Sequence, residues 1–484
     1  MIHIPDRVKQ GAGISFGSPG GEGGRYQKKN LRIGTIMLES KSLTVLSEAL
    51  SNLEQGFNDL PEINTDTDLE SLRTVMQLVS DKMKDNFPYF HPLYAGQMLK
   101  PPHPIARLAY MLAMWINPNN HAMDGGRASS EMEKEAVAQI AAMFGWDRFL
   151  GHLSSGGTMA NLEALWVAGK LCHGKTILAS DQAHYTHSRI SEVLGLHFSS
   201  VSSDQSGRMN IHALEEAVQT GNIGTVVATL GTTGSGAIDP LVEILALKNK
   251  YGFRVHVDSA YGGYFTLIDN LDQRGRRAFD AIPEVDSIVV DPHKHGLQPY
   301  GCGCVLFKDP EVGKLYKHDS PYTYFSSAEL HLGEISLECS RAGASAVALW
   351  ATQQLLPRKK GGEFAVDLSK SRSAALDLYG RLKSDDRFKM IMEPDLDIVI
   401  WAVKAESCSK ISELSQTMFD LAAENNLHLA LFSIPTSSLD ASWGDVTFDS
   451  DSVTCLRSCL MKPEHEEWMD QIWTLIDKIT KEIC

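Results

Sequence analysis

Residues 254–263 read Arg-Val-His-Val-Asp-Ser-Ala-Tyr-Gly-Gly, a short apolar strand pattern that runs into an aspartate and then into small residues. A second apolar run, Ser287 to Val290, leads in the same way into Asp291-Pro292-His293-Lys294-His295-Gly296. Buried strands of this kind are typical of parallel sheets, in which ligands bind beyond the carboxyl ends of the strands. The pattern therefore predicts that Asp258 and Lys294 lie at the ligand-binding edge of an α/β sheet.

The same alternation of strands and helices extends from about residue 150 to residue 310. It predicts a mostly parallel central sheet flanked by helices on both faces. From about residue 370 the pattern is helix, strand, helix, strand and a final helix, which predicts a smaller α/β domain. Strands are expected at Lys175–Ala179, Gly195–Val201, Thr225–Leu230, Arg254–Val257, Ser287–Val290 and Cys302–Phe307, with helices at Thr158–Lys170, Ile211–Gln219 and Leu241–Lys250.

Three regions follow from these patterns. We expect residues 1–95 to form an N-terminal arm and two amphipathic helices that wrap a dimer partner, residues 96–360 to form the large domain, and residues 361–484 to form the small C-terminal domain. The two helices, within residues 41–86, have no obvious partner in the same chain, and this favours a homodimer. Further helices are expected near residues 103–115, 130–144, 343–356 and 468–479.

The composition excludes several classes of function. The 484 residues carry a formal net charge of −15, with 43% hydrophobic and 22% charged residues. A negative surface disfavours binding to nucleic acid or to anionic membranes. No stretch approaches the roughly 18 uninterrupted apolar residues of a membrane helix, and the eight cysteines lack metal-ligand spacing. We therefore expect a cytoplasmic protein with reduced thiols and no metal, which acts on a small molecule.

Three motifs carry candidate chemistry. The turn at residues 153–158, Leu-Ser-Ser-Gly-Gly-Thr, precedes a predicted helix, whose N–H groups and positive end can hold a phosphate. Asp258 can hold a proton on a buried ring nitrogen, and Lys294 can attack an aldehyde. Each motif alone has a simpler explanation: a strand-to-helix turn, a capped loop aspartate or an exposed lysine. Together they supply the three contacts that pyridoxal phosphate requires.

With these motifs the chain resembles the group II amino-acid decarboxylases, fold-type I pyridoxal-phosphate enzymes that include aromatic-amino-acid, tyrosine, glutamate and diaminobutyrate decarboxylases. The resemblance runs from about His91 to the C-terminal helix. It implies conversion of an L-amino acid to its amine with release of carbon dioxide, in a homodimer with shared active sites. The matching blocks are Asn117–Asp124, Ser155–Asn161, Ser180–His184, Gly231–Gly234, His256–Tyr261 and Asp291–Lys294.

The resemblance also implies a role for each matching residue. Lys294 would carry the cofactor as a Schiff base, and Asp258 would pair with the pyridine nitrogen. His184 would stack on one face of the ring, and Ala260 would lie against the other. The remaining cofactor contacts are expected from Gly157, Thr158 and His293 at the phosphate and from Thr233 near the polar edge of the ring.

The sequence departs from the family pattern in two places. In the family, the proton that replaces the carboxylate commonly comes from a loop tyrosine. The matching stretch, with Tyr322 and Tyr324, looks shorter than the loops of the animal enzymes, and aromatic packing against a partner is the alternative role of the two rings. Asp291 stands where several relatives carry asparagine, a change expected to alter the phosphate contacts without removing the chemistry.

The substrate side chain has two competing signals. Gln97 resembles a substrate-contacting glutamine of the glutamate-type members, and Arg457 resembles a position able to bind a carboxylate. An exposed structural arginine is the alternative for Arg457. The segment Gly296–Gly301 is more similar to the bacterial tyrosine-decarboxylase branch. We therefore expect either an aromatic, tyrosine-like substrate or an acidic one, like glutamate or aspartate.

Three other functions fit parts of the sequence. A carbon–carbon lyase, a desulfurase or an aldehyde-forming oxidative decarboxylase would need the same lysine and aspartate. A metal-dependent hydrolase would use the pairs His184/His187 and His293/His295. A non-catalytic partner protein would keep the cofactor but lack a proton donor.

Overall fold

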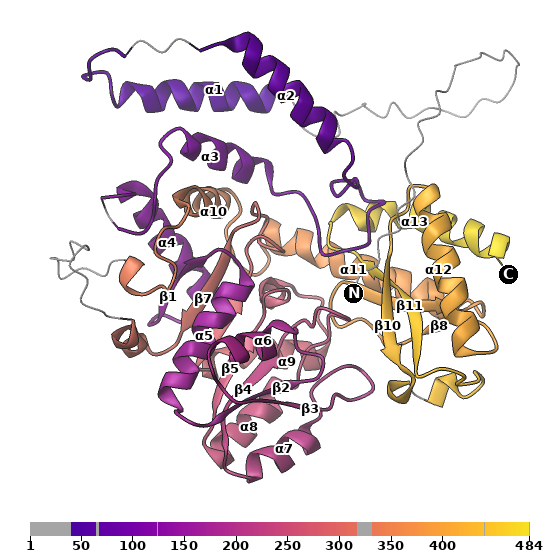
Figure 1. The fold of residues 1–484 in the computed structure, drawn as a ribbon. Helices are drawn as coiled ribbons and strands as arrows, with labels where there is room; N and C mark the ends of the chain where they lie inside the picture. Colours follow the sequence, from indigo (N-terminus) through magenta and orange to yellow (C-terminus); the bar gives the residue numbers. More distant parts are fainter. Residues whose placement is uncertain (1–39, 64–66, 123, 317–331, 440, 484) are drawn as a thin grey trace, which may run out of the picture. The chain divides into compact units, whose positions relative to one another are not determined.

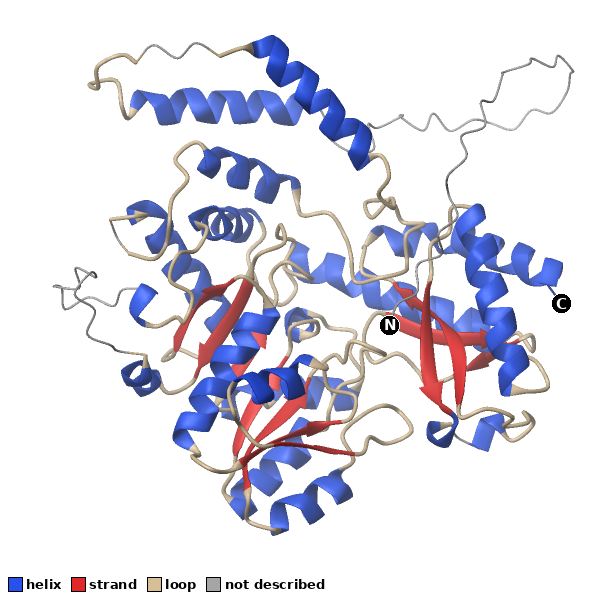
Figure 2. Ribbon diagram, in the orientation of Figure 1, coloured by secondary structure: helices blue, strands red, loops and turns tan. Residues whose placement is uncertain are grey.

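Two separate sheets organise the chain, drawn in red in Figure 2. The structure is a computed structural model that describes residues 40–484 except 64–66, 123, 317–331, 440 and 484. Within these residues the larger sheet has seven strands in the order β1-β7-β6-β5-β4-β2-β3 (Figure 1). Its strands are β1 Leu150–Ser154, β2 Thr176–Ser180, β3 Phe198–Val201, β4 Ile223–Thr229, β5 Arg254–Asp258, β6 Ser287–Val290 and β7 Gly303–Phe307.

The large sheet is mostly parallel, as the sequence predicts. In the sheet, β3, β2, β4, β5 and β6 lie side by side in that order and pair in parallel. β7 is antiparallel to both of its neighbours, β6 and β1. Each of the six expected strands forms within three residues of its predicted ends. The sequence does not predict β1, because Leu-Gly-His-Leu-Ser has a weak strand pattern. In the structure this segment forms a strand by pairing with β7.

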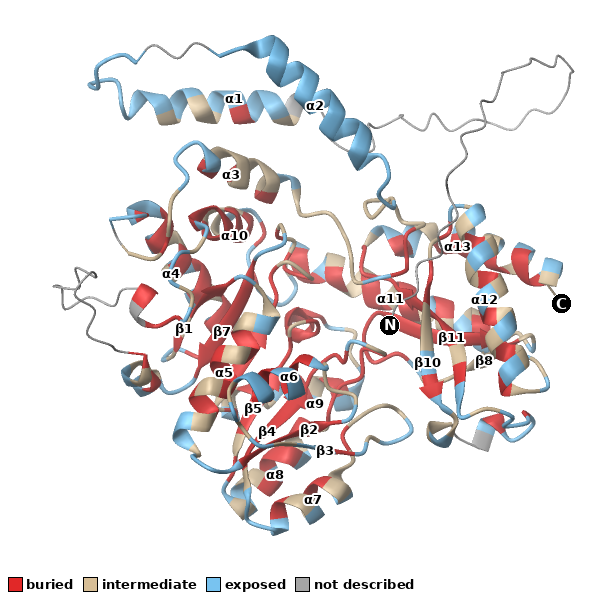
Figure 3. Ribbon diagram, in the orientation of Figure 1, coloured by how far each residue is buried: buried red, intermediate tan, exposed pale blue. Residues whose placement is uncertain are grey.

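Helices cover the large sheet, and its strands β5, β6 and β7 are almost wholly buried (Figure 3). The expected helices form at α3 Pro104–Met114, α4 Arg127–Met143, α5 Gly157–Leu171, α7 Ile211–Gln219, α8 Leu241–Tyr251 and α10 Gly343–Leu355, and the structure adds α6 Thr186–Val193 and α9 Gln273–Asp280. Of these, α5 packs on β6 and β7, and α8 packs on β5.

The second sheet is antiparallel and has the order β10-β11-β9-β8. The sequence predicts only two strands in this region. The edge strands β8 and β10 give weak patterns, because β8 has three residues and β10 alternates irregularly between buried and exposed positions. The elements that share its core are β8 Phe388–Met390, β9 Ile398–Val403, β10 Ala430–Pro435, β11 Ser452–Cys459, α11 Glu363–Lys383, α12 Cys408–Glu424 and α13 Glu464–Ile483.

The two helices expected near the N-terminus are α1 Ser40–Gln55 and α2 Leu69–Met83. α1 packs against α3, whereas α2 buries none of its described side chains. No helix in the described ranges combines the length and the apolar character that a bilayer crossing needs.

The segment just before β9 fastens the second sheet to the large one. The Asp395 carboxylate accepts hydrogen bonds from Arg208 Nε at 3.0 Å and Nη2 at 2.8 Å, and from the backbone N–H of Ile238 at 3.0 Å. Asp397 Oδ1 accepts a hydrogen bond from the Tyr261 hydroxyl at 2.6 Å. Both aspartates are buried, so little water competes with these bonds.

Close backbone packing sets the position of the loop before α5. A Cβ built on Gly303 in β7 would lie 2.6 Å from the carbonyl carbon of Gly156 and 2.7 Å from its Cα. The obstacle is backbone rather than a flexible side chain, so it cannot turn aside. The position of this loop therefore depends on a glycine at residue 303.

We expect Gly303→Ala to lower the free energy of unfolding by about 1–3 kcal/mol, because the added methyl group overpacks the loop against β7. Gly380→Ala is the matched control. Gly380 is exposed in α11, with nothing within 4 Å of its Cβ position, and alanine there should be neutral or stabilise by about 0.5–1 kcal/mol. Urea unfolding of the two variants measures the difference, and equal stabilities would contradict the packing argument.

Candidate active site

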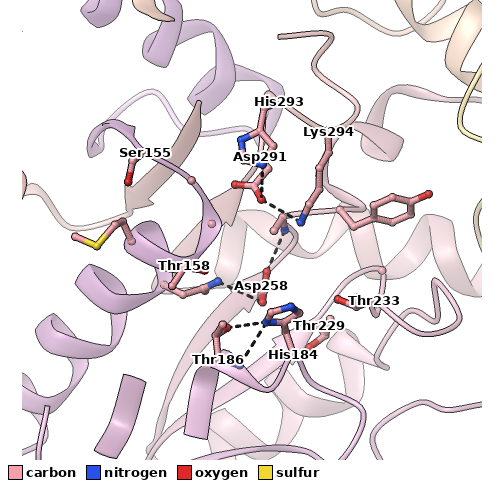
Figure 4. A pocket seen from close by; sticks show the side chains of 17 residues that line it. Ser155, Thr158, His184, Thr186, Thr229, Thr233, Asp258, Asp291, His293 and Lys294 are labelled. Atoms are coloured by element: carbon pink, nitrogen blue, oxygen red, sulfur yellow. Dashed lines mark hydrogen bonds and ion pairs between the residues drawn. The ribbon is translucent and has the colours of Figure 1, made fainter. Parts of the chain in front are cut away.

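A cavity of about 290 Å³ lies where β4, β5 and β6 end, next to the start of α5 (Figure 4). Parallel pairing aligns these strand ends, because Asp258 lies beside Thr229 on one side and Val289 on the other. All eight residues that the sequence suggests as cofactor contacts line this cavity: Gly157, Thr158, His184, Thr233, Asp258, Ala260, His293 and Lys294.

The start of α5 forms the end of the cavity that suits an anion. The helix begins at Gly157, so its first N–H groups have no partner within the helix. A Cβ at Gly157 would meet the two carboxylate oxygens of Asp291 at 2.7 and 3.0 Å, so a larger residue here would have to displace that side chain. Nearby, the Nδ1 atom of His293 is buried and makes no hydrogen bond within the described residues. A phosphate oxygen would satisfy both kinds of group.

Lys294 presents its amine to the same cavity. It lies in the connection between β6 and β7, and its side chain points toward the centre of the cavity in Figure 4. Nζ lies 3.0 Å from Asp291 Oδ2. Burial lowers the pKa of the neighbouring His293, so that ring is neutral near pH 7. Lys294 is therefore the cationic side chain that the cavity lining holds beside Asp291.

Asp258 is a buried carboxylate with three hydrogen-bond donors. Oδ2 accepts from His187 Nε2 at 2.8 Å and from Asn161 Nδ2 at 3.3 Å, and Oδ1 accepts from the N–H of Ala260 at 3.1 Å. Burial would raise the pKa of Asp258, but the hydrogen bonds and the charge of His187 outweigh it and hold the pKa below its usual range. Asp258 is thus ionised. A carboxylate must be ionised in order to hold a proton on a neighbouring ring nitrogen.

A polar network behind Asp258 cannot be assigned from the sequence. Asn161 Oδ1 bonds to His256 Nε2 at 2.8 Å, and His256 Nδ1 bonds to Ser287 Oγ at 2.9 Å. Burial lowers the pKa of His256 to about 3, so its ring is neutral. The spacing His184-x2-His187 is the one signal in the sequence that points to part of this network.

His184 has a fixed ring orientation. The backbone N–H of Thr186 donates to His184 Nδ1 at 3.3 Å, and the Thr186 hydroxyl lies 2.8 Å from the same atom. Nδ1 is therefore an acceptor, and the proton of the neutral ring is on Nε2. Burial lowers the pKa of His184, which favours this neutral form. The ring is held as a planar wall of the cavity.

The two expected substrate contacts, Gln97 and Arg457, meet beyond the cavity lining. Arg457 in β11 donates from Nε to the carbonyl of Gly234 and from Nη2 to the carbonyl of Thr233, both at 2.8 Å, and from Nη1 to Gln97 Oε1 at 3.3 Å. Its side chain is buried, so the alternative of an exposed arginine is wrong. No carboxylate among the described residues lies within 4.0 Å of this guanidinium. The arginine is thus a buried cation beside Thr233, which lines the cavity.

The remaining expected residues fall outside this arrangement. Tyr322 and Tyr324 lie outside the described residues. The histidine pairs of the metal-dependent alternative separate, because His187 bonds to Asp258 and His295 lies with Nε2 3.3 Å from Asp397 Oδ2. Within the described ranges, no group of three His, Cys, Asp or Glu residues is placed to hold a metal ion.

The cavity therefore fits the three ends of pyridoxal phosphate. The start of α5 and His293 can take the phosphate, and the ionised Asp258 can take the protonated ring nitrogen. The Lys294 amine can take the aldehyde. The start of α5, whose first N–H groups have no partner within the helix, and the unpaired His293 nitrogen are the observations on which this fit depends.

Known proteins of one enzyme class are similar to this chain. The family model described as "Pyridoxal-dependent decarboxylase conserved domain" matches residues 50–404. The L-tyrosine decarboxylase of Enterococcus faecium is 27% identical over 452 residues, covering 68% of this chain and 71% of that protein. The aspartate 1-decarboxylase of Aliivibrio fischeri is 28% identical over 415 residues, covering 76% of this chain and 72% of that protein.

Solved structures share the fold. The crystal structure of Oryza sativa TDC with PLP and tryptamine matches with a TM-score of 0.74 and 18% identity, over 91% of this chain and 96% of that one. The crystal structure of mouse CSAD matches with a TM-score of 0.73 and 17% identity, over 91% of this chain and 99% of that one. These likenesses confirm the expected fold-type I architecture.

Proposed function

Because this chain belongs to the pyridoxal-dependent decarboxylase family, we propose that it removes the α-carboxylate of an L-amino acid as carbon dioxide and releases the amine. The cofactor of the family is pyridoxal 5′-phosphate. The observation that carries the proposal is the cavity at the strand ends, where the family's motif residues converge. The similar curated proteins act on tyrosine or aspartate by name, which supports a substrate of one of these two kinds.

Each residue has a proposed part in the reaction. Bound pyridoxal phosphate supplies an aldehyde for the substrate amine and a protonated ring that draws electrons from the breaking Cα–carboxylate bond. Lys294 holds the cofactor between turnovers, and Asp258 keeps the proton on the ring nitrogen. His184 and Ala260 bound the two faces of the ring. The phosphate contacts are assigned to Gly157, Thr158 and His293, and the polar-edge contact to Thr233.

The proton donor is proposed from the sequence alone. Decarboxylation ends with a proton added to the α-carbon, and Tyr322 and Tyr324 are the candidates. If the proton went to the cofactor instead of the α-carbon, the substrate nitrogen would remain on the cofactor, as pyridoxamine phosphate, and an aldehyde would be released in place of the amine. The ratio of amine to aldehyde in the Tyr322→Phe and Tyr324→Phe variants therefore identifies the donor, and an unchanged ratio in both excludes the pair.

We expect borohydride reduction of the cofactor-loaded protein to leave a phosphopyridoxyl group on Lys294, identified by peptide mass mapping. Lys294→Ala should carry no label and should release no carbon dioxide, because the cofactor is no longer held by a bond. The wild type should release carbon dioxide from L-aspartate, L-glutamate or L-tyrosine. A label without carbon dioxide would contradict decarboxylation and leave the cofactor assignment intact, whereas no label would contradict both.

The position and charge of Arg457 favour an acidic substrate. The close partners of this buried guanidinium are carbonyl and amide oxygens, and no carboxylate among the described residues lies within 4.0 Å to neutralise its charge directly. A side-chain carboxylate is the group that would neutralise it with charge-assisted hydrogen bonds. A tyrosine-like substrate would place no charge there. L-aspartate or L-glutamate is therefore the preferred substrate class.

Arg457→Met should lower kcat/KM for the acidic substrate by about 10–100-fold, the loss expected for hydrogen bonds to a charged group. Turnover of L-tyrosine, where measurable, should change far less. Gln97→Glu is a second test, because the new carboxylate would occupy the guanidinium and compete with the substrate. Equal losses on acidic and aromatic substrates would mean that Arg457 only holds the loop of Thr233 and Gly234.

We also propose a homodimer in which α2 contacts the second copy. The α2 stripe is a set of exposed apolar side chains, each between 44% and 67% exposed, on a helix of 15 residues with none buried. Apolar patches of this density mark protein interfaces. Its members are Leu69, Leu72, Val75, Met76, Leu78, Val79 and Met83.

The double variant Leu72→Asp, Val79→Asp should sediment as a monomer where the wild type sediments as a dimer. The two positions lie seven residues apart on one helix face, so both charges enter the interface. Gln77→Glu in the same helix is the control and should remain dimeric. A dimeric double variant would show that α2 does not form the interface.

A further inference from the structure

A second cavity, of about 680 Å³, lies beside the segment that fastens the second sheet to the large one. Residues of five places line it: the connection from β3 to α7, the start of α9, α11, β8 and the connection from β8 to β9. It shares no lining residue with the cavity of the candidate active site. A ligand here would therefore serve a purpose other than the proposed reaction.

The second cavity is basic in a chain that is acidic overall. Among the described residues its lining holds five cationic side chains and three carboxylates, whereas the whole chain has a formal net charge of −15. A local excess of two positive charges attracts small anions to this place. The cations are Arg208, Arg274, Arg372, Lys383 and Lys389, and the carboxylates are Asp272, Glu393 and Asp395.

Three guanidinium groups gather around one residue, Asp395. Its carboxylate accepts hydrogen bonds from Arg208 Nη2 at 2.8 Å and from Arg274 Nη2 at 2.6 Å. Its backbone carbonyl accepts a hydrogen bond from Arg372 Nε at 2.8 Å. Arg274 Nη2 also lies 3.2 Å from Asp272 Oδ2. Two carboxylates therefore face three guanidinium groups.

Arg372 is the member of this group that lacks a counter-ion. It is 4% exposed, and its Nη1 donates a hydrogen bond to the carbonyl of Asn270. Within the described ranges, no carboxylate lies within 4.0 Å of this guanidinium, and Nη2 has no hydrogen-bond partner. Arginine stays charged in proteins, so an anion in the cavity would stabilise this buried cation.

The rest of the lining adds two lysines and an apolar wall. Lys383 forms no ion pair in the part of the chain that the structure describes, and its Nζ lies 5.3 Å from the centre of the Tyr379 ring. Lys389 pairs with Asp445, but Lys404 shares that carboxylate, so the positive excess remains. The apolar wall consists of Phe388, Met390, Ile391, Met392 and Pro394.

We propose that the second cavity binds a small organic phosphate, a molecule with one phosphate monoester group and an apolar part. Such a group carries about −1.5 to −2 charges near pH 7 and offers three acceptor oxygens, which matches the two excess cations and the three guanidinium groups. Guanidinium groups pair with phosphate oxygens through parallel hydrogen bonds. A single carboxylate would bring less charge. The volume of about 680 Å³ lies within the range of roughly 300–1,000 Å³ that small-molecule sites have.

The test is isothermal titration calorimetry of the cofactor-loaded, full-length protein with AMP, glucose 6-phosphate and inorganic phosphate. Excess pyridoxal 5′-phosphate is removed first, so that it occupies the active-site cavity and leaves the second cavity free. At least one of the two organic phosphates should bind, and more tightly than inorganic phosphate, because the apolar wall contributes only to the organic probes. The bound probe should also raise the thermal unfolding midpoint.

The double variant Arg274→Gln, Lys383→Gln should weaken binding of the organic probe by about 10–100-fold, the loss expected for hydrogen bonds to a charged group. Both side chains are exposed, so the fold should tolerate the change. Arg277→Gln, Lys359→Gln is the matched control. It removes the same charge from exposed residues outside the lining and should bind the probe as the wild type does.

The other outcomes would each overturn the proposal. Neither organic phosphate might bind at millimolar concentrations, or the Arg274→Gln, Lys383→Gln variant could bind as tightly as the wild type, which would place the probe elsewhere. Equal losses in both double variants would mean that the overall charge of the protein attracts the probe. Inorganic phosphate that binds as tightly as the organic probes would exclude an organic ligand. Should the first double variant not fold, as judged by circular dichroism, Lys383→Glu alone takes its place.

Discussion

Parallel pairing of β4, β5 and β6 is the constraint on which the site depends. The register sets Asp258 between Thr229 and Val289, so the connections that follow these strands leave the sheet at one edge. The antiparallel return of β7 then packs Gly303 against Gly156 and brings the start of α5 to the same edge. The cavity is therefore a consequence of strand order, and each motif contributes only because the sheet delivers it to this place.

The two aspartates of the cavity show how surroundings decide what one residue type can do. Asp258 receives three hydrogen bonds, from Asn161, His187 and the backbone N–H of Ala260. Asp291 pairs with Lys294, the residue that we propose binds the cofactor. Hydrogen bonds fixed by the fold stabilise the ionised form of Asp258, whereas Asp291 lies against the amine of the proposed cofactor lysine.

Residues at strand ends could be predicted from the sequence, because short apolar runs locate them without knowledge of distant contacts. Asp258 and Lys294 belong to this class, and so does Gly157 at the start of a helix. His187 does not, because its hydrogen bond to Asp258 joins residues 71 positions apart. The burial of Arg457 likewise arises only when the second sheet meets the loop of Thr233 and Gly234. β1 and the edge strands of the second sheet could not be predicted from their own residues, because their strand patterns are weak and only pairing with a neighbouring strand identifies them.

The buried links before β9 bear on how the molecule moves. Asp395 holds Arg208 and the backbone of Ile238, and Asp397 holds Tyr261, itself part of the cavity wall. Swinging the second sheet away as a rigid body would break all of these bonds at once. Hinge opening between the sheets is therefore a costly route to the interior.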